Sequence, residues 1–439
     1  MFPRIVFTSL LLMILAGLGY GVFRLVVGRQ PLPQATAMIE RHDPHAAQLI
    51  LRPLVKTDPR NAEAHVLLAR AQLDLNDAVA AEKEIKIARA LRYERSIINP
   101  LLARSYIMQE RYQDVLADVP ANATRAEERL TNLSLRATAY ALMGDVPQAQ
   151  ASLDAAAEIS AFDPAVSLAR AYVESARSDL TAALTAVNAS LDTAPKDLDA
   201  LMLKANIQLR MDEPAQAMET VTAAIGLDRN SVPARVFRAH LYIAMNEDKK
   251  ARADVDAAID VDWHDVQLAL ANALLMMRSG RVGDATNFIQ SRLPSFVATP
   301  KAFYYLALAF SMQDQNESSY EMLTRFQKVV PKDRDGLRLQ GLLEQRLGRP
   351  AVSVDVLQRL VQTAPKDALA FDLLGRAHFM QGHTREAVDA YRRATILEPN
   401  NKDFASHLAA AQVSFGDPSA TSSGSPASAP PPAVTPAIR

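Results

Sequence analysis

Apolar residues recur at helical spacing along two neighbouring segments near the C-terminus, residues 368–380 and 385–397. Residues three and four apart lie on one face of a helix, so each segment is predicted to be a helix with an apolar face. A short polar stretch, residues 381–383, separates the two segments, and Pro399 ends the second one. The pattern therefore predicts a helix hairpin.

Small residues stand among the large ones at fixed positions of this hairpin. Gly375 and Ala387 each lie inside a predicted helix, with Phe371, Leu374 and Tyr391 as large neighbours. Because a small side chain lets two packed helices approach closely, both small positions are predicted to be contact points between helices.

These positions recur upstream every 34 residues without an insertion. The position of Gly375 is always Ala or Gly: Gly341, Ala307, Ala273, Ala239, Ala205, Ala171, Ala137, Ala103 and Ala69. The position of Ala387 is Ala or Ser with one exception, Val115: Ser353, Ser319, Ala285, Ala251, Ala217, Ala183, Ala149, Ala81 and Ala47. Such self-similarity indicates a solenoid, in which each hairpin buries its apolar face against its neighbours.

The register divides the chain into segments. Ten complete hairpins are predicted over residues 62–401, after a partial first repeat over residues 31–61 whose second helix has Asp43 as its N-cap. Residues 402–416 are predicted to be a capping helix, and residues 417–439, rich in Pro, Ser and Ala, a disordered tail. Four polar residues are assigned to the outer face of the capping helix: Lys402, Asp403, Ser406 and His407.

One repeat is irregular. Pro120 is predicted to shorten the helix that begins near Tyr112, and the following stretch ANATRAEER, residues 121–129, is predicted to be a loop. The superhelix is expected to bend at this repeat.

The N-terminal segment, residues 1–30, carries an uncharged run of 19 residues from Ile5 to Phe23, and its apolar character continues to residue 27. A run of this length can span a bilayer, so residues 5–27 are predicted to be a retained transmembrane helix. A cleaved signal peptide is the alternative. The orientation of this helix in the membrane is open, because positive charges flank it on both sides: Arg4 before it and Arg24 and Arg29 after it.

Charge and composition exclude several classes of function. The chain has 48 basic and 49 acidic residues, a net charge of −1, which gives no long-range attraction for nucleic acid. Cysteine is absent, which rules out disulfides and zinc sites built on thiolates. No nucleophile elbow, phosphate-binding glycine loop or HExxH motif occurs. We therefore predict that the protein is not an enzyme and has no catalytic residue, metal or cofactor.

Two histidine pairs are the remaining candidates for metal chemistry. His42 and His45 flank Asp43 and are interpreted as residues at the start of a helix. His378 and His383 lie across a predicted helix end and are not expected to share a face.

The spacing Phe371-x-x-Leu374-Gly375-x-x-His378, followed by Ala387-x-x-x-Tyr391 and Pro399, resembles the tetratricopeptide repeat (TPR). The resemblance implies an all-α TPR solenoid, a right-handed superhelix of helix hairpins, here with an N-terminal transmembrane helix. It also implies that the first helix of each hairpin lines the concave surface.

The concave positions are rich in arginine and aromatic residues: Arg70, Arg104, Tyr172, Asn206, Arg210, His240, Arg278, Tyr304, Arg338, Arg346 and Arg376. Acidic residues at these positions are fewer: Glu63, Asp74, Asp199, Asp335 and Asp372. Arginine binds carboxylates in a bidentate manner, so a binding site for an acidic peptide or an acidic sugar is predicted. A groove that is merely solvated is the alternative.

Phrases such as NAEAHVLLARAQLDL and GLRLQGLLEQRLGRPAVSVDVLQRLV are similar to TPR proteins that accompany exosortase (PEP-CTERM) and exopolysaccharide systems of Gram-negative bacteria. The resemblance implies a single-pass protein of the bacterial inner membrane with a periplasmic repeat domain. Its expected role is a scaffold for proteins of an envelope complex, in exopolysaccharide export or surface-protein sorting. The alternative is a cytoplasm-facing membrane adaptor that recruits a soluble partner or protease.

Overall fold

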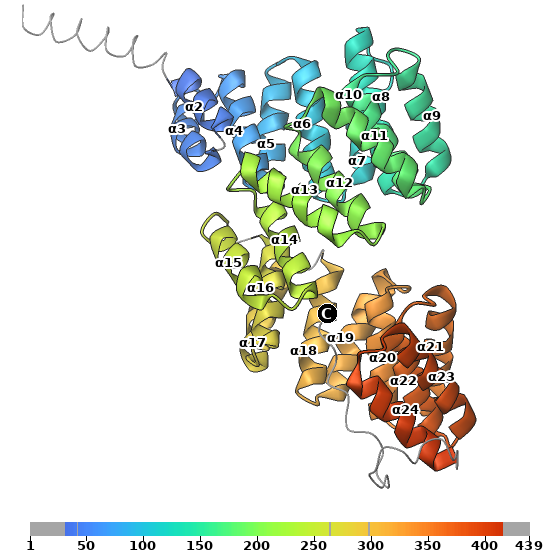
Figure 1. Cartoon of the computed structure of the whole chain (residues 1–439). Helices are drawn as coiled ribbons and strands as arrows, with labels where there is room; N and C mark the ends of the chain where they lie inside the picture. The colour runs from blue at the N-terminus through green and yellow to red at the C-terminus, as the bar shows by residue number, and fades with distance from the viewer. Residues whose placement is uncertain (1–30, 42, 263–264, 297–298, 416–439) are drawn as a thin grey trace, which may run out of the picture. The chain divides into compact units, whose positions relative to one another are not determined.

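The computed structural model describes residues 31–41, 43–262, 265–296 and 299–415, and these residues form α-helices, one short 3₁₀ helix and no strand (Figure 1). The all-α solenoid predicted from the repeat is confirmed. Within these ranges, none of the helices is both long and apolar enough to cross a bilayer. The predicted anchor, residues 5–27, and the predicted tail, residues 417–439, lie outside the described residues.

The chain forms two compact units, residues 1–268 and 269–439, with the boundary inside helix α16. Unit 1 contains α2 (Pro31–Glu40), α3 (Pro44–Thr57), α4 (Ala62–Asp74), α5 (Ala78–Ala90), α6 (Arg95–Met108), α7 (Tyr112–Asp118), α8 (Ala126–Leu142), α9 (Val146–Ala157), α10 (Pro164–Ala176), α11 (Leu180–Thr193), α12 (Leu198–Arg210), α13 (Pro214–Leu227), α14 (Val232–Ala244), α15 (Asp248–Ile259) and the start of α16 (Val266–Arg278). Consecutive helices of this unit pack together in pairs, such as α4 with α5 and α10 with α11.

Unit 2 begins within α16 and consists of the same kind of hairpins. Its other elements are α17 (Val282–Arg292), the 3₁₀ helix η1 (Leu293–Phe296), α18 (Pro300–Met312), α19 (Asn316–Val329), α20 (Arg334–Arg346), α21 (Pro350–Thr363), α22 (Ala368–Met380), α23 (Thr384–Leu397) and α24 (Lys402–Phe415). Pairs such as α18 with α19 and α22 with α23 pack together.

The two small positions of the repeat are buried contact points, as predicted. The alanines at the position of Gly375, from Ala69 to Ala307, are all 0% exposed, as are those at the position of Ala387. A β-carbon built on Gly341 would lie 2.6 Å from Cγ of Leu357. The large side chain of the second helix therefore fills the space beside the small residue of the first.

Short polar side chains begin many of the helices. Asp43 accepts a hydrogen bond from the backbone N–H of Ala46 at 3.0 Å, which confirms it as an N-cap. Other N-caps of the same kind are Asn61, Asp77, Asp145, Asp163, Asp179, Asp197, Ser231, Asp333 and Asp367.

The turn inside each hairpin places a left-handed residue at the same repeat position. These residues have φ between 56° and 80°: Asn76, Glu110, Gly144, Ser178, Asp212, Asn246, Gly280, Asp314, Gly348 and Gly382. In the first of these turns the N–H of Asp77 donates to the carbonyl of Gln72 at 2.8 Å, and the N–H of Asn76 to that of Leu73 at 3.0 Å. This is the Schellman pattern, which satisfies the last carbonyls of the first helix before the chain reverses.

The irregular repeat is shorter than its neighbours. Helix α7 has seven residues and ends at Asp118, which confirms the effect predicted for Pro120. The loop predicted over residues 121–129 was too long, because α8 already begins at Ala126. Glu127 and Glu128 lie in the first turn of α8, where negative charge stabilises the N-terminal end of a helix.

The last helix, α24, packs against α23. Lys402, Asp403 and Ser406 are exposed, as predicted for an outer face. The assignment of His407 to that face was wrong, because it is 7% exposed and its Nδ1 lies 2.7 Å from Oδ1 of Asp372. A carboxylate on α22, 35 positions earlier in the chain, supplies the polar partner that lets the imidazole be buried.

Candidate functional site

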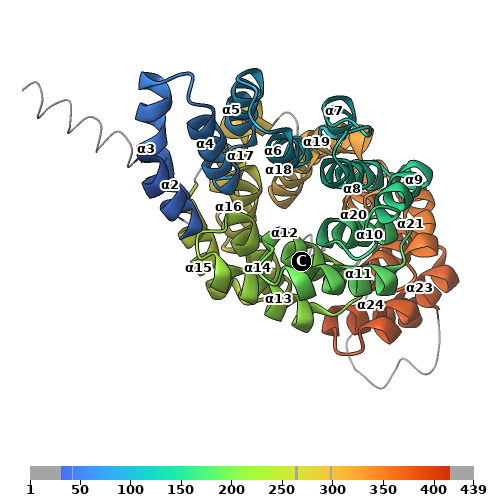
Figure 2. The ribbon, with the colours of Figure 1, turned by 90° about the horizontal axis from the view of Figure 1, so that it is seen from above.

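The positions predicted to be concave, on the first helix of each hairpin, form what we call the first-helix face. In unit 1 the helices follow one another around an arc that brings α12 back toward α6 (Figure 2). Arg104 of α6 connects three of these helices. Its Nη1 lies 3.2 Å from Oδ1 of Asp74 on α4, and its Nε lies 3.6 Å from Oδ2 of Asp199 on α12. The charge of Arg104 is therefore compensated within the protein.

Carboxylates gather around Arg104. Burial raises the pKa of Asp74, Arg104 partly offsets that rise, and Asp228 adds to it. Burial also raises the pKa of Asp197, with a further contribution from Asp199. Like charges raise a carboxyl pKa only when they lie close together, so this part of the first-helix face carries clustered acidic groups.

Tyr172 lies beside these acids, half-buried in α10. Burial is the main cause of its raised pKa, followed by the charges of Asp199 and Asp197. The structure thus brings Arg104 and Tyr172, two predicted site residues, into one acidic neighbourhood rather than onto a basic surface.

Three other predicted residues of unit 1 are exposed on the first-helix face: Arg70, Asn206 and Arg210. Arg210 donates hydrogen bonds to Oγ and to the carbonyl oxygen of Ser175, the latter at 3.1 Å. Arg70 and Asn206 make no hydrogen bond or ion pair with other described residues. His240 is half-buried in α14.

In unit 2 the predicted residues are less exposed. Tyr304 is half-buried, with ring centroids of Tyr305 and Phe326 each 5.5 Å away, and burial raises its pKa. Arg338 pairs with Asp335, and its Nε lies 3.6 Å from Oδ2 of Asp367. Most of these contacts lie within one hairpin, and the contact of Arg338 with Asp367, the N-cap of α22, joins two neighbouring hairpins.

Arg346 and Arg278 are also half-buried. Nη1 of Arg346 donates to the carbonyl of Ser311 at 2.6 Å and lies 3.3 Å from Oδ1 of Asp314. Arg376 differs from both, because its Nη1 is buried without a hydrogen-bond partner among the described residues.

The expectation that His378 and His383 do not share a face was wrong. Their ring centroids are 6.0 Å apart, because the tight turn after α22 folds His383 back toward the end of that helix. Burial lowers the pKa of His378. Within the described ranges, no three His, Cys, Asp or Glu side chains are placed to hold a metal ion.

His45 lies in the first turn of α3, as its interpretation required. Its Nε2 is 2.8 Å from the carbonyl oxygen of Val261, so this nitrogen carries the proton and donates it. His42 lies outside the described residues.

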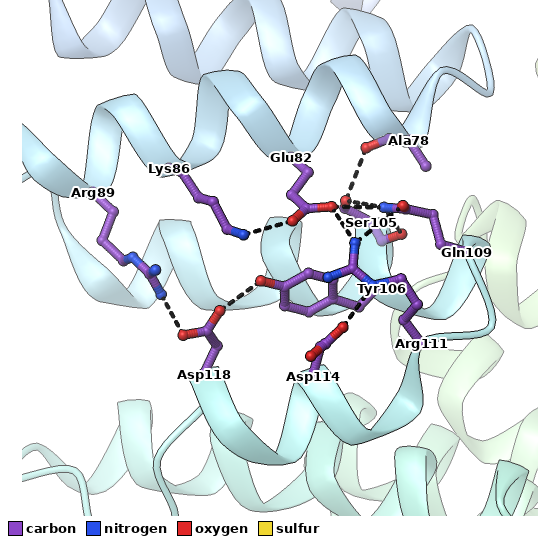
Figure 3. Close-up of polar contacts among 10 residues, drawn as sticks. All are labelled: Ala78, Glu82, Lys86, Arg89, Ser105, Tyr106, Gln109, Arg111, Asp114 and Asp118. Carbon is purple, nitrogen blue, oxygen red and sulfur yellow. Dashed lines mark hydrogen bonds and ion pairs between the residues drawn. The ribbon is translucent and has the colours of Figure 1, made fainter.

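A polar network that sequence reasoning did not find surrounds Tyr106 on α6 (Figure 3). The Tyr106 hydroxyl donates to Asp118 at 2.5 Å, and Asp118 also accepts from Arg89 at 2.9 Å. Cζ of Arg111 lies 4.9 Å and Nζ of Lys86 5.7 Å from the ring centroid of Tyr106. The two cations therefore interact with the aromatic ring.

Glu82 completes this network by accepting from Lys86 at 2.6 Å, Arg111 at 2.7 Å and Gln109 at 3.0 Å. Although burial opposes the change, hydrogen bonds from Lys86 and Gln109 lower the pKa of Glu82. Because its donors and acceptors satisfy one another, the network holds the short helix α7 against α5 and α6. The two cations separated by 25 positions, Lys86 and Arg111, could be recognised as partners of one tyrosine only after folding.

Comparisons with known proteins agree with this description. Tetratricopeptide-repeat family models match residues 38–104 and 368–401. No curated protein matches the chain. The narrower resemblance to exosortase-associated proteins gains no support from these matches.

Solved structures resemble the chain at low sequence identity. They include the APC/C hetero-tetramer Cut9–Hcn1, at 12% identity and a TM-score of 0.50, covering 88% of this chain and 90% of that one. A tetratricopeptide repeat protein from Parabacteroides merdae is 17% identical, with a TM-score of 0.42. The match covers 55% of this chain and 96% of that protein's chain. Yeast Tom70 has 12% identity, coverage of 91% of each chain, and a TM-score of 0.41. The chain therefore carries tetratricopeptide repeats, folded as an all-α solenoid.

Proposed function

We propose that the protein is a non-catalytic, membrane-anchored scaffold that mediates protein–protein interaction in cell-envelope assembly. The observation that supports this most is the contrast between buried and exposed positions of the same helices. The alanines at the two small positions of the repeat are 0% exposed, whereas Arg70, Asn206 and Arg210 on the first-helix face are exposed. A tightly packed frame that presents polar side chains is suited to holding a partner protein, as TPR solenoids generally do.

The membrane anchor in this proposal rests on the amino-acid sequence. Ile5 to Phe23 is an uncharged run long enough to span a bilayer, and the repeats begin soon after it. We place the repeats in the periplasm of a Gram-negative bacterium, attached to the inner membrane by a single helix. The partners are then proteins of an envelope complex, or an acidic polysaccharide handled by it.

The pathway part of the proposal is exopolysaccharide export or surface-protein sorting. Its support is the resemblance of the repeat sequences to TPR proteins of exosortase and exopolysaccharide systems. The likeness to Cut9 shows the fold alone at 12% identity, and it transfers no partner to this chain.

A cytoplasm-facing adaptor is the second candidate, because the flanking charges of the anchor, Arg4 against Arg24 and Arg29, are nearly balanced. Protease treatment separates the two. If the repeats are periplasmic, protease added to spheroplasts digests them, while intact cells protect them. Protection in spheroplasts would overturn the periplasmic placement and support the cytoplasmic adaptor.

Attachment is tested separately by deleting residues 1–30. The shortened chain should leave the membrane fraction, since the described helices contain no span long and apolar enough to hold it there. Retention of the shortened chain in carbonate-washed membranes would contradict the proposed anchor.

A further inference from the structure

The arc of unit 1 is crossed by an ion pair between two first helices that do not pack closely against each other (Figure 2). Nε of Arg104 on α6 lies 3.6 Å from Oδ2 of Asp199 on α12, although the first helices α8 and α10 come between them in the chain. Among the described helices, α6 packs closely with α4, α5, α7 and α8, and α12 with α11 and α13. At this point the arc is therefore closed by side chains that reach across it.

Arg104 also neutralises acidic groups that come from both sides of the arc. Its Nη1 lies 3.2 Å from Oδ1 of Asp74 on α4. Burial is the main cause of the raised pKa of Asp74, and the charge of Asp228, which follows α13, raises it further. Without Arg104 these carboxylates would repel each other across the arc. Arg104 is thus the cation that lets the two sides meet.

Two more polar contacts join the first hairpins of unit 1 to its last ones. Nδ2 of Asn76, in the turn between α4 and α5, donates to Oδ2 of Asp265, 189 positions later. Nε2 of His45 on α3 donates to the carbonyl oxygen of Val261 at 2.8 Å, over 216 positions. The arc is therefore closed at more than one point by contacts between polar groups.

These closing contacts are weak beside those that join consecutive hairpins. The side chains of Arg104 and Asp199 are 37% and 57% exposed, so water and salt screen their attraction. Consecutive hairpins share buried apolar clusters instead, such as the one that includes Ala205, Val221 and Leu241 of α12, α13 and α14. The closing contacts are therefore expected to break while the hairpins stay folded.

We propose that the Arg104–Asp199 bridge is an autoinhibitory contact, which keeps a partner polypeptide from the first-helix face of unit 1 until the bridge breaks. The proposal rests on the proposed function, because it adds regulation to the face that the scaffold uses. A polypeptide that runs along the first helices from α6 to α12 meets the bridge and must displace it. The contacts of Asn76 and His45 hold the arc closed beside the bridge.

Pulsed electron paramagnetic resonance on the full chain tests whether the bridge closes the arc. The chain has no cysteine, so spin labels attach only where cysteine is introduced. Leu49→Cys on α3 and Asp256→Cys on α15 place labels at two exposed positions, 76% and 61% exposed. With the bridge intact, low ionic strength should give one short distance between the labels. Arg104→Gln combined with Asn76→Ala should add a population at longer distance.

Three controls accompany this measurement. Labels at Leu49→Cys and Lys83→Cys lie on the nearby second helices α3 and α5, and their distance should not change. Arg70→Gln should shift the α3–α15 distance less than Arg104→Gln does, because Arg70 makes only a minor charge contribution at Asp74. Asp199→Asn breaks the bridge from its other side and keeps the test available if Arg104→Gln does not fold. An α3–α15 distance unchanged in the bridge variants would overturn the closing role.

Access of the partner is read out in cells by a photoreactive amino acid at Asn206, an exposed residue of α12. The yield of the partner adduct should rise several-fold when Arg104→Gln and Asn76→Ala are added. Equal yields with and without these changes would overturn the autoinhibition and leave the scaffold standing. If no adduct forms in either protein, the scaffold proposal fails and the autoinhibition fails with it, whereas the distances still decide whether the bridge closes the arc.

Discussion

Gly375 and Tyr391 are the two halves of one packing contact: a β-carbon on Gly375 would lie 2.8 Å from Cδ1 of Tyr391. Replacing Gly375 with Ala should therefore destabilise the protein by about 1–3 kcal/mol, because the buried ring cannot move aside without strain. Thermal melting measures the effect.

Gly226 of α13 is the matched control, since no atom lies within 4 Å of a β-carbon there. Gly226→Ala should be neutral or stabilising by up to about 1 kcal/mol. A Gly375→Ala variant that melts like wild type would contradict the contact.

The left-handed turn position supplies a second prediction. Gly144 has φ 79° and open space around it, so Gly144→Ala tests backbone conformation alone and should cost about 1 kcal/mol. Ser178 occupies the same repeat position with φ 66°, and Ser178→Gly should be neutral or slightly stabilising. Melting temperatures that move in the same direction for both variants would argue against a left-handed requirement.

The Tyr106 network predicts how stability depends on pH. Burial and the hydrogen bond to Asp118 raise the pKa of Tyr106 from 10.0 to about 12. A group with a raised folded pKa contributes stability below its unfolded pKa, and this contribution is lost as pH rises through the folded value. The stability difference between wild type and Tyr106→Phe should therefore be constant up to pH 10 and then shrink toward about pH 12. Denaturant unfolding at several pH values measures it, and a constant difference across this window would contradict the hydrogen bond.

The same network also makes stability depend on pH in the acid range, through Asp118. Burial opposes the shift, yet hydrogen bonds from Tyr106 and Arg89 lower the pKa of Asp118 below its ordinary 3.8. Its contribution is present above that value and is lost as pH falls through the lower folded pKa. Asp118→Asn should thus be less stable than wild type at pH 7, with the difference closing below pH 3.8. If the two proteins unfold alike at pH 7, the ion pair with Arg89 and the bond from Tyr106 contribute nothing.

Arg104 and Arg70 should behave differently although they share a repeat position. Arg104 pairs with Asp74 and Asp199, so Arg104→Gln should lower stability by up to about 1 kcal/mol, a small value because the groups are partly exposed. Arg70→Gln should change melting less than Arg104→Gln does, because the exposed side chain of Arg70 makes no hydrogen bond or ion pair with a described residue and its charge acts on Asp74 only as a minor contribution. Asp74→Asn in the Arg104→Gln background should recover part of the loss by removing an uncompensated carboxylate. Equal melting of the two arginine variants would contradict the bridge.

Features set by local sequence could be predicted, and contacts between distant repeats could not. The buried small positions, the Asp43 cap and the early end of α7 each depend on residues within one repeat or on its period. The pairing of Arg104 with Asp199 depends on how the arc of unit 1 closes, which no single repeat encodes. The burial of His407 likewise requires a carboxylate from another hairpin.

The turn position was missed for a different reason. Only four of its ten residues are glycine, so the usual sequence mark of a left-handed residue is diluted by Asn, Asp, Ser and Glu. The repeat period itself could have revealed it, because all ten lie 34 positions apart. The candidate binding residues do lie on the first helices of their hairpins, as the repeat register predicted. The sequence could not show which of the arginines form ion pairs with carboxylates of the same protein.

Photo-crosslinking in living cells tests the scaffold most directly. A photoreactive amino acid at Asn206 or Arg210 lies on the first-helix face, whereas one at Asp256 lies on α15, a second helix, with its side chain 61% exposed. We predict that Asn206 and Arg210 yield one shared protein adduct that Asp256 does not yield. Absence of any adduct at Asn206 and Arg210, or the same adduct at Asp256, would contradict binding through the first-helix face.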